Sequence, residues 1–281
     1  MQLLDGKKVA AWYRRRLRTQ VEARRKDGVY PELAIVLAGE DTASAMYASS
    51  MKKAAEAIGL QGTIHRFAAT VTEETLLSCI ERLNGKDEVF GILVMLPLPS
   101  HIHANRVINA ICPEKDVDGL TDSSVARLYT GKPSFIPCTP KAVMAVLAYY
   151  HIALAGKEVV IVGRSNIVGK PLAQLCLQEN ATVTVCHSHT QALSQVVRRA
   201  DVVIGAVGKA ACITGDMIKP GAVVIDIGIN CKNGKTVGDV AFDEAAKIAG
   251  AITPVPGGIG AVTTTMAVSY THLTLPTNRE V

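Results

Sequence analysis

The chain has 281 residues, of which 48% are hydrophobic, 20% charged and 4% aromatic, and its net charge is +5. This composition is typical of a folded protein of one or two domains and excludes an intrinsically disordered chain. No apolar run approaches the roughly 20 residues that a membrane-spanning helix needs. The first residues also lack an apolar signal core, so we expect a cytoplasmic protein with no membrane partner.

The cysteines and the basic residues indicate no special site. The seven cysteines are dispersed without a CxxC pair, which predicts reduced thiols and neither a disulfide framework nor a zinc site. Many arginines lie between residues 14 and 26, and we interpret them as the solvated face of a helix. Because aromatic residues are scarce, we expect no nucleic-acid partner.

The first half of the chain alternates between helical and extended patterns. Apolar spacing predicts helices at 8–27, 44–58 and 72–83, the last with Thr72 as its N-cap. Short apolar runs predict buried strands at 31–38, 62–67 and 90–96, the last of which is broken by Pro97. This alternation predicts a mainly parallel sheet with helices on both faces.

The second half has the pattern of a nucleotide-binding domain. Thr139 and Pro140 favour the N-cap and first residue of a helix that runs to about residue 150. Strands are predicted at 158–162, 182–186, 201–204, 222–227 and 251–253, and a last helix at 261–268. Residues 269–281 lose helical periodicity, and we interpret them as a foreign tail, with a native tail as the alternative.

A glycine-rich loop follows the first strand of this second half. Gly163 to Pro171 connects the strand to a helix that we expect to begin at Leu172. Free backbone N–H groups at a helix start form an anion site, and Arg164 could fork onto a phosphate. The loop does not match GxGxxG, so an ordinary strand-to-helix turn remains the alternative.

The end of the next predicted strand indicates which dinucleotide would bind. In a doubly wound domain this position faces the adenosine ribose, where NAD enzymes usually carry an acidic residue. Here the sequence reads His187-Ser188-His189, and Ser188 can donate a hydrogen bond to a 2′-phosphate. The sequence therefore favours NADP. The two histidines lack further ligands at metal-binding spacing, so no metal is assigned.

Four short motifs in a fixed order resemble one family. They are residues 96–99 (LPLP), 113–120 (PEKDVDGL), the loop 163–171, and 254–260 (PVPGGIG). Together they closely resemble the bifunctional methylenetetrahydrofolate dehydrogenase/methenyltetrahydrofolate cyclohydrolase family over roughly residues 1–268.

The resemblance implies an α/β fold with two α/β domains around a cleft, the second a Rossmann-like NADP-binding domain. It implies a folate-binding catalytic domain at 1–138 plus 263–281 and the NADP-binding domain at 139–262. It also implies an enzyme of one-carbon metabolism whose cofactor is NADP and whose substrate is a folate, possibly polyglutamylated. The family is usually homodimeric, so a homodimer is expected.

The resemblance also assigns site residues. Tyr47 matches the tyrosine beside the folate, and Asp118 matches the aspartate that anchors the pterin ring. The substrate-binding positions are Tyr47, Leu96, Pro97, Asp118, Pro256, Gly257 and Gly258. The cofactor-binding positions are Gly163, Arg164, Ser165, Val168, Gly169, Ser188 and Ile229. Asp116 and Asp118 lack further acidic ligands, so they predict no metal site.

Two catalytic positions depart from the family pattern. The family has lysine four residues after its tyrosine and glutamine before its Leu-Pro-Leu-Pro, where this chain has Met51 and Met95. Hydride transfer to NADP needs no protein proton carrier, whereas hydrolysis of the methenyl bridge does. Methionine cannot supply a proton. We therefore predict a retained dehydrogenase and a weak or lost cyclohydrolase.

Two alternatives remain open for this half of the chemistry. Lys52 could replace the missing lysine if a helix distortion shifted the register, although it points about a quarter turn away from Met51. The chain could also be a non-catalytic paralogue that binds folate or NADP without turnover.

Overall fold

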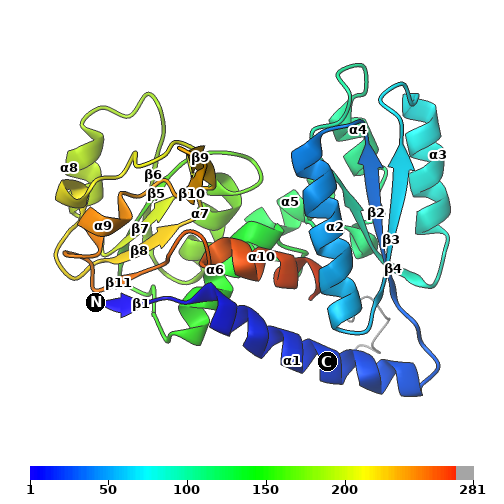
Figure 1. Cartoon of the computed structure of the whole chain (residues 1–281), viewed down its shortest axis with the longest axis horizontal. Helices are drawn as coiled ribbons and strands as arrows, with labels where there is room; N and C mark the ends of the chain where they lie inside the picture. Colours follow the sequence, from blue (N-terminus) through cyan, green and yellow to red (C-terminus); the bar gives the residue numbers. More distant parts are fainter. Residues whose placement is uncertain (270–281) are drawn as a thin grey trace. The chain divides into compact units, whose positions relative to one another are not determined.

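In the computed structural model, which describes residues 1–269, the chain folds into two compact α/β units (Figure 1). The six-stranded unit comprises Met1–Ala11 and Thr139–Thr263, and the three-stranded unit comprises Trp12–Cys138 with residues 264–269. The predicted α/β fold of two domains is confirmed. Within residues 1–269, no helix is both long and apolar enough to span a membrane.

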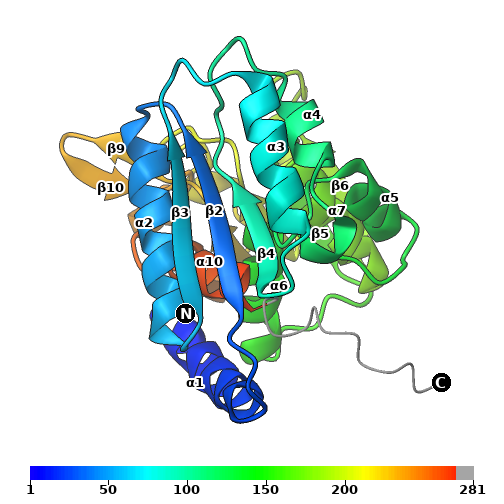
Figure 2. The same cartoon turned by 90° about the vertical axis from the view of Figure 1, so that its right-hand side faces the viewer.

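The three-stranded unit contains a parallel sheet in the order β3-β2-β4, with the strands side by side in Figure 2. Its strands are β2 (Glu32–Ala38), β3 (Gln61–Phe67) and β4 (Val89–Val94). The central strand β2 is buried along its whole length. Ile35 pairs with Ile64 on one side and Leu93 on the other. Such a continuous apolar run is typical of a parallel strand covered on both faces.

Helices cover both faces of this sheet, as predicted. The long helices around it are α1 (Gly6–Lys26), α2 (Thr42–Ala57) and α3 (Glu73–Asn84). Alternate β2 side chains point to opposite faces. Leu33, Ile35 and Leu37 lie in one core with residues of α1 and α2, and the alternate residues lie in a second core with residues of α3. Thr72 caps α3 as predicted, because its hydroxyl accepts from the Thr75 N–H.

The segment after β4 differs from its prediction. β4 ends at Val94, so Met95 and Leu96 lie beyond the strand that we expected at 90–96, and the Leu96–Pro97 peptide is cis. Short elements that were not predicted follow, namely α4 (Ala104–Asn109), the 3-10 turn η1 (Pro113–Lys115) and α5 (Asp122–Tyr129). Helix α6 (Cys138–Tyr149) already includes Thr139, which therefore lies inside the helix and is not its N-cap.

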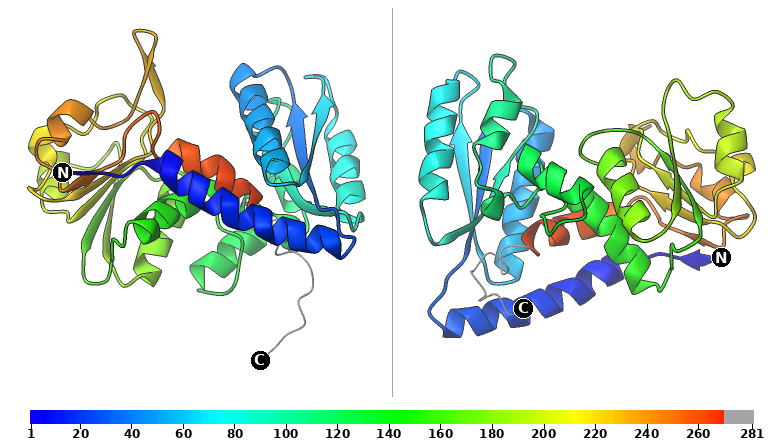
Figure 3. Two further views of the ribbon diagram at one scale, coloured as in Figure 1. Left: turned by 60° about the horizontal axis from the view of Figure 1, so that its bottom comes forward. Right: turned by 180° about the vertical axis from the view of Figure 1, so that it is seen from behind.

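The six-stranded unit contains a wholly parallel sheet in the order β1-β11-β8-β7-β5-β6. Its strands are β1 (Gln2–Leu3), β5 (Glu158–Val162), β6 (Thr182–Cys186), β7 (Val202–Gly205), β8 (Val223–Asp226) and β11 (Ala251–Ile252). All five predicted strands are present. β1, which lies beside β11 at the sheet edge in Figures 1 and 3, was not predicted.

The connections of this sheet include helices and one hairpin. Their bounds are α7 (Gly169–Gln178), α8 (Leu193–Arg198), η2 (Gly215–Met217), β9 (Asn230–Lys232), β10 (Lys235–Val237), α9 (Phe242–Ala245) and α10 (Ile259–Val268). β9 and β10 pair with each other as an antiparallel hairpin. α7 begins at Gly169, three residues before the predicted Leu172, so the turn at 163–168 is shorter than expected. Apart from Ser269, the predicted foreign tail lies outside the described residues.

The strand order places a topological switch beside β5. β6 lies on one side of β5, and the chain then crosses through α8 to β7 on the other side. In open parallel sheets, ligands bind beyond the carboxyl ends of the strands at such a switch. The loops after β5, β6, β7 and β8 are therefore the expected binding region of this unit.

Candidate functional site

Tyr47 and Met51 lie one turn apart on α2. The buried face of this helix carries Ser44, Ala48, Met51 and Ala55. Met51 is completely buried, whereas Tyr47 keeps 39% of its surface exposed at the edge of that face. Burial of the hydroxyl, and then the nearby Cys138 and Asp118, raise the pKa of Tyr47 above its usual range. Tyr47 is therefore a neutral phenol that a ligand can reach.

The segment after β4 is tied to the same helix. The Ser44 hydroxyl of α2 donates to the Leu96 carbonyl over 3.0 Å, and the Met95 N–H donates to the Val36 carbonyl over 2.9 Å. Met95 is 3% exposed and belongs to the same apolar core as Met51. Leu96 and Pro97 are exposed directly beside it. Met51 and Met95 are thus packed among core side chains, whereas Tyr47 and Leu96 are partly exposed at the surface.

The loop that carries Asp118 is folded around Asp116, which is buried. Asp116 accepts N–H groups from Leu120 and Thr121. Gly119 has a φ of +61°, and a Cβ there would lie 2.7 Å from the Phe135 carbonyl oxygen. Only glycine suits a position that combines this backbone with such a close approach. Asp116 and Gly119 therefore fix the loop that presents Asp118.

Asp118 lies in a poorly solvated position beside the start of α6. Its carboxylate accepts from the Cys138 N–H over 3.4 Å. Burial raises the pKa of Asp118 to about 6, and the Asp116 charge adds to this, while the hydrogen bonds from Cys138 oppose it. A carboxyl group whose pKa lies this near neutrality responds strongly to a hydrogen-bonding ligand.

Lys52 and Lys53 do not approach the Met51 position. Lys52 forms an ion pair of 3.7 Å with Glu56 and is 44% exposed, and Lys53 is exposed. α2 is continuous across this region, with no distortion that shifts its register. Each residue of a helix turns by about 100°, so neither amine shares the Met51 direction.

The loop after β5 packs glycine against backbone. Gly163 has a φ of +136°, and a Cβ there would collide with the Ala206 carbonyl. A Cβ on Gly169 would collide in turn with the Gly163 carbonyl. This close packing brings the backbone of the loop to the start of α7. We call residues 163–169 the glycine cradle: the missing Cβ atoms let its backbone pack against other backbone, and phosphate binding there stays a prediction.

The side chains of this loop have distinct partners. The Ser165 hydroxyl accepts from the N–H groups of Val168 and Gly169 over 3.2 and 3.4 Å. These two N–H groups are thus occupied within the protein, which corrects our expectation that the loop leaves its amides free. Arg164 is exposed next to them. Its guanidinium is the group of this loop that can reach a solvent-side phosphate.

The loop after β6 lies next to this loop because β5 and β6 pair in register, Val162 opposite Cys186. Thr190 accepts from the His187 N–H, and His187 accepts from the His189 N–H, so the turn is held by its own side chains. Ser188 is exposed at its tip. No group of three or more metal-ligating side chains occurs within residues 1–269.

The remaining predicted residues also lie in the six-stranded unit. Ile229 follows β8 and is 71% exposed. Gly257 has a φ of +102°, and a Cβ on Gly258 would collide with the Pro254 carbonyl. Pro256 is exposed and follows a cis peptide bond. Backbone conformation and close packing therefore explain why positions 257 and 258 are glycine, independently of any ligand.

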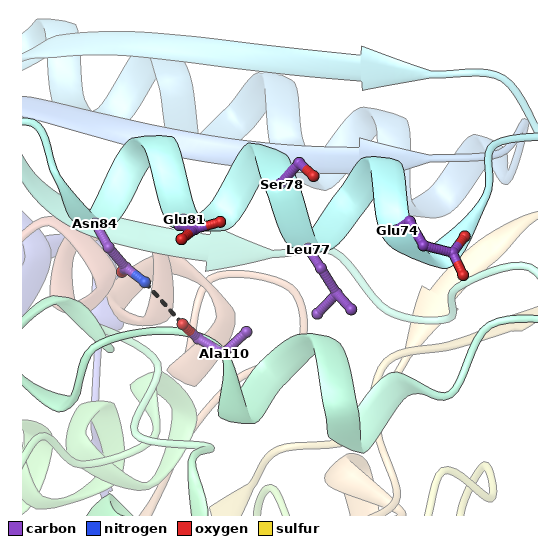
Figure 4. A pocket seen from close by; sticks show the side chains of 6 residues that line it. All are labelled: Glu74, Leu77, Ser78, Glu81, Asn84 and Ala110. Atoms are coloured by element: carbon purple, nitrogen blue, oxygen red, sulfur yellow. Dashed lines mark hydrogen bonds between the residues drawn. The ribbon is translucent and has the colours of Figure 1, made fainter.

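A surface hollow of the three-stranded unit is unrelated to these residues (Figure 4). It lies along α3 and the end of α4, and its lining residues are Glu74, Leu77, Ser78, Glu81, Asn84 and Ala110. Asn84 donates to the Ala110 carbonyl across it over 2.7 Å. None of the predicted site residues lines it.

Comparisons with known proteins identify the chain. Residues 4–118 match the family model described as tetrahydrofolate dehydrogenase/cyclohydrolase, catalytic domain, and residues 137–278 match its NAD(P)-binding domain. The chain belongs to the tetrahydrofolate dehydrogenase/cyclohydrolase family. The resemblance seen in the sequence is thereby confirmed.

Similar members of this family cover nearly the whole chain. The bifunctional protein FolD of Pelobacter propionicus is 52% identical over 96% of this chain and 95% of its own length. The crystal structure of the Campylobacter jejuni bifunctional enzyme FolD has a TM-score of 0.96 at 42% identity, covering 98% of both chains. A Trypanosoma brucei structure, titled as complexed with NADP cofactor and inhibitor, has a TM-score of 0.90 at 38% identity and covers 96% of this chain and 95% of its own.

Three residues that support the site of this family member were missed by sequence reasoning. Ser44 holds the Leu96 carbonyl, Cys138 holds Asp118, and Lys115 donates to three carbonyls at the C-terminal end of α3 and just beyond it over 2.6–3.2 Å. Ser44 lies three residues before Tyr47, one helical turn away, and this spacing is the one signal that was available. The other two contacts depend on tertiary structure.

Proposed function

We propose that this family member is an NADP-dependent methylenetetrahydrofolate dehydrogenase whose cyclohydrolase step is weak or lost. The observation that carries this proposal is the burial of Met51 and Met95 in one apolar core beneath Tyr47. The NAD(P)-binding domain and the NADP named for the Trypanosoma brucei relative support the cofactor.

The residues present suit the oxidation step. When bound, NADP would supply the hydride acceptor for the methylene carbon of the folate, and this oxidation requires no proton carrier from the protein. The protein must then orient the folate, and we assign this role to Tyr47 and Asp118. The neutral Tyr47 ring offers a stacking surface, and the Asp118 carboxylate can accept pterin N–H groups. Alignment of the reacting rings accounts for much of the rate.

The same residues do not suit hydrolysis. Water must add to the methenyl carbon and lose a proton, and a proton must reach the departing nitrogen as the ring opens. The thioether groups of Met51 and Met95 carry no transferable proton. Lys52 is held by Glu56 on another side of α2, which argues against the alternative that it replaces the missing lysine.

A two-step assay tests this proposal directly. Purified protein with methylene-tetrahydrofolate and NADP is expected to form NADPH while methenyl-tetrahydrofolate accumulates, which its own absorbance reveals. Methenyl-tetrahydrofolate added alone should disappear at the rate of buffer, because no side chain moves the protons. Hydrolysis well above that rate would overturn the loss of cyclohydrolase. Absence of NADPH formation, with both ligands bound in calorimetry, would instead support a non-catalytic paralogue.

Folate binding is expected to depend on the ionisation of Asp118. Its pKa of about 6 in the free protein means that the carboxylate accepting pterin N–H groups is depleted below that pH. Binding should favour the ionised form and lower this pKa, so affinity rises with pH up to about 6 and then levels off. The dissociation constant of 5-formyl-tetrahydrofolate should increase about tenfold per pH unit below about 6.

The Asp118→Asn variant is the control for this pH dependence. It keeps the size of the side chain and does not ionise, so its affinity should be weak and nearly independent of pH between 5 and 8. An unchanged pH profile in this variant would show that another group controls folate binding.

The preference for NADP rests on the loops after β5 and β6. Arg164 and Ser188 are exposed there, with no acidic residue at the end of β6. We also infer a cytoplasmic homodimer from the family resemblance. Light scattering of the purified protein should give twice the mass of the chain.

A further inference from the structure

A buried carboxylate organises the loops beyond β7 and β8. Asp239, which follows the β9–β10 hairpin, is fully buried. It accepts three consecutive backbone N–H groups, from Val207 over 2.6 Å, Gly208 over 3.0 Å and Lys209 over 2.9 Å. It also accepts from the Asn230 side chain over 3.0 Å. One carboxylate thus joins the loop after β7 to the segment after β8.

A second carboxylate fixes the first. Asp226, at the end of β8, is 3% exposed and accepts the N–H groups of Gly228, Asp239 and Val240, each over 2.9 Å. A Cβ on Gly228 would collide with the Asp239 carboxylate, and one on Gly238 would collide with that of Asp226. Asp239 is therefore held at two points: its backbone N–H donates to Asp226, and its carboxylate accepts the hydrogen bonds described above.

The loop that Asp239 holds is adjacent to the glycine cradle. The Ala206 N–H donates to the Val162 carbonyl over 2.8 Å, and Gly163 packs against the Ala206 carbonyl. The loop therefore lies at the switch between β5 and β7. Ser188 assigns the adenosine end of the dinucleotide to the β6 side, so the β7 and β8 side is left for the nicotinamide end.

The hydrogen bonds of Asp239 decide what this loop presents to a ligand. Three of its N–H groups point to the carboxylate and are not available to cofactor phosphates. The exposed side chains that this arrangement presents are the aliphatic Val207, 36% exposed, and Ile229, 71% exposed, together with the cationic Lys209. Val207 is part of the loop that Asp239 holds. Ile229 immediately precedes Asn230, whose side-chain amide donates to Asp239.

We propose that Asp239 is a positioning residue for the nicotinamide end of NADP, acting through the backbone that carries Val207 and Ile229. This inference rests on the proposed NADP dependence. Asp239 is fully buried, so it would act on the cofactor only through the backbone that presents Val207 and Ile229.

The Asp239→Asn variant tests the inference by separating the two ends of the cofactor. An asparagine keeps the volume, but its NH₂ group cannot accept an N–H, so part of the loop is released. Removal of such a charged hydrogen bond is expected to raise the dissociation constant for NADP about tenfold in calorimetry. Binding of adenosine 2′,5′-bisphosphate, which has the adenosine end and no nicotinamide, should change less than about twofold. The KM for methylene-tetrahydrofolate should also be retained while kcat falls.

Asp201 offers a matched control at the opposite end of the same sheet. It accepts from the Glu158 N–H over 3.0 Å and from the Lys219 amine over 2.7 Å, at the amino ends of β5 and β7. The Asp201→Asn variant should lower the Tm without changing the affinity for either nucleotide. If Asp239→Asn does not fold, Asn230→Ala removes one contact of the same carboxylate and should give the same selective loss to a smaller extent, about threefold.

Several results would overturn the inference. Equal weakening of NADP and adenosine 2′,5′-bisphosphate would assign Asp239 a general structural role, and unchanged NADP affinity would assign it none in cofactor binding. These outcomes leave the proposed function intact. If the unmodified protein binds neither nucleotide, the proposed cofactor fails, and the inference fails with it.

Discussion

The Met51→Lys, Met95→Gln double variant is expected to hydrolyse methenyl-tetrahydrofolate about 100- to 10,000-fold faster than the unmodified protein, which is the usual range for a proton-transferring group. Met51 is fully buried in an apolar core, so a lysine there would have a lowered pKa and would exchange protons near neutral pH. The two-step assay measures the gain as faster loss of methenyl absorbance.

The two substitutions should act together. A lysine at position 51 alone is a buried amine without an acceptor, which we expect to destabilise the protein. Glutamine at position 95, in the same core, supplies a carbonyl acceptor. We therefore expect a small gain from Met51→Lys, none from Met95→Gln, and a large gain only from the pair.

A control of similar volume separates this chemistry from packing. Met51→Leu combined with Met95→Leu keeps the core apolar and should leave both activities as they are. If the lysine and glutamine pair folds and binds folate but gains no hydrolysis, then other features of this chain prevent that step.

The Gly163→Ala variant is expected to lose NADP binding by at least tenfold and to lose about 2–4 kcal/mol of unfolding free energy, since the methyl group meets both backbone strain and a steric clash. Gly163 has a φ of +136°, and an added Cβ would collide with the Ala206 carbonyl. The collision would displace the loop after β5, which we propose as the phosphate-binding loop. Denaturant unfolding and calorimetry with NADP measure the two effects.

Gly156→Ala is the matched control for this substitution. Gly156 also has a positive φ, +73°, but has nothing within 4 Å of the added methyl group. It should cost about 1–2 kcal/mol of unfolding free energy through backbone strain alone and leave NADP affinity unchanged. Similar NADP affinities for the two variants would show that the cradle tolerates a side chain.

The parts of the fold that the sequence predicted are those with a strong local signal. β2 and β5 are continuous apolar runs between turn residues, and α3 has a capping threonine at its start. β1 was missed because two residues have no periodicity, and it exists only by pairing with β11. The end of β4 was misplaced because the apolar run continues through Met95 and Leu96, whereas the strand ends at Val94.

The candidate site shows the same division. Tyr47, Met51 and the glycine loop follow from motifs that are contiguous in the sequence. The support of Asp118 by Cys138 joins residues 20 positions apart, and the Asp239 contacts join residues about 30 positions apart. No local pattern predicts the Asp239 contacts, because its partners are distant peptide groups and not side chains.

Each of the two units is built from two segments that lie far apart in the chain, and this affects folding during translation. The six-stranded unit needs Met1–Ala11, and β1 can pair only after β11 has been synthesised some 250 residues later. The three-stranded unit likewise includes Ala267 and Val268 in its core. At the roughly 5–20 residues per second of translation, β11 follows β1 after about 12–50 s, and Ala267 follows Cys138 after about 6–26 s. Neither unit can therefore be completed on the ribosome before almost the entire described chain has emerged.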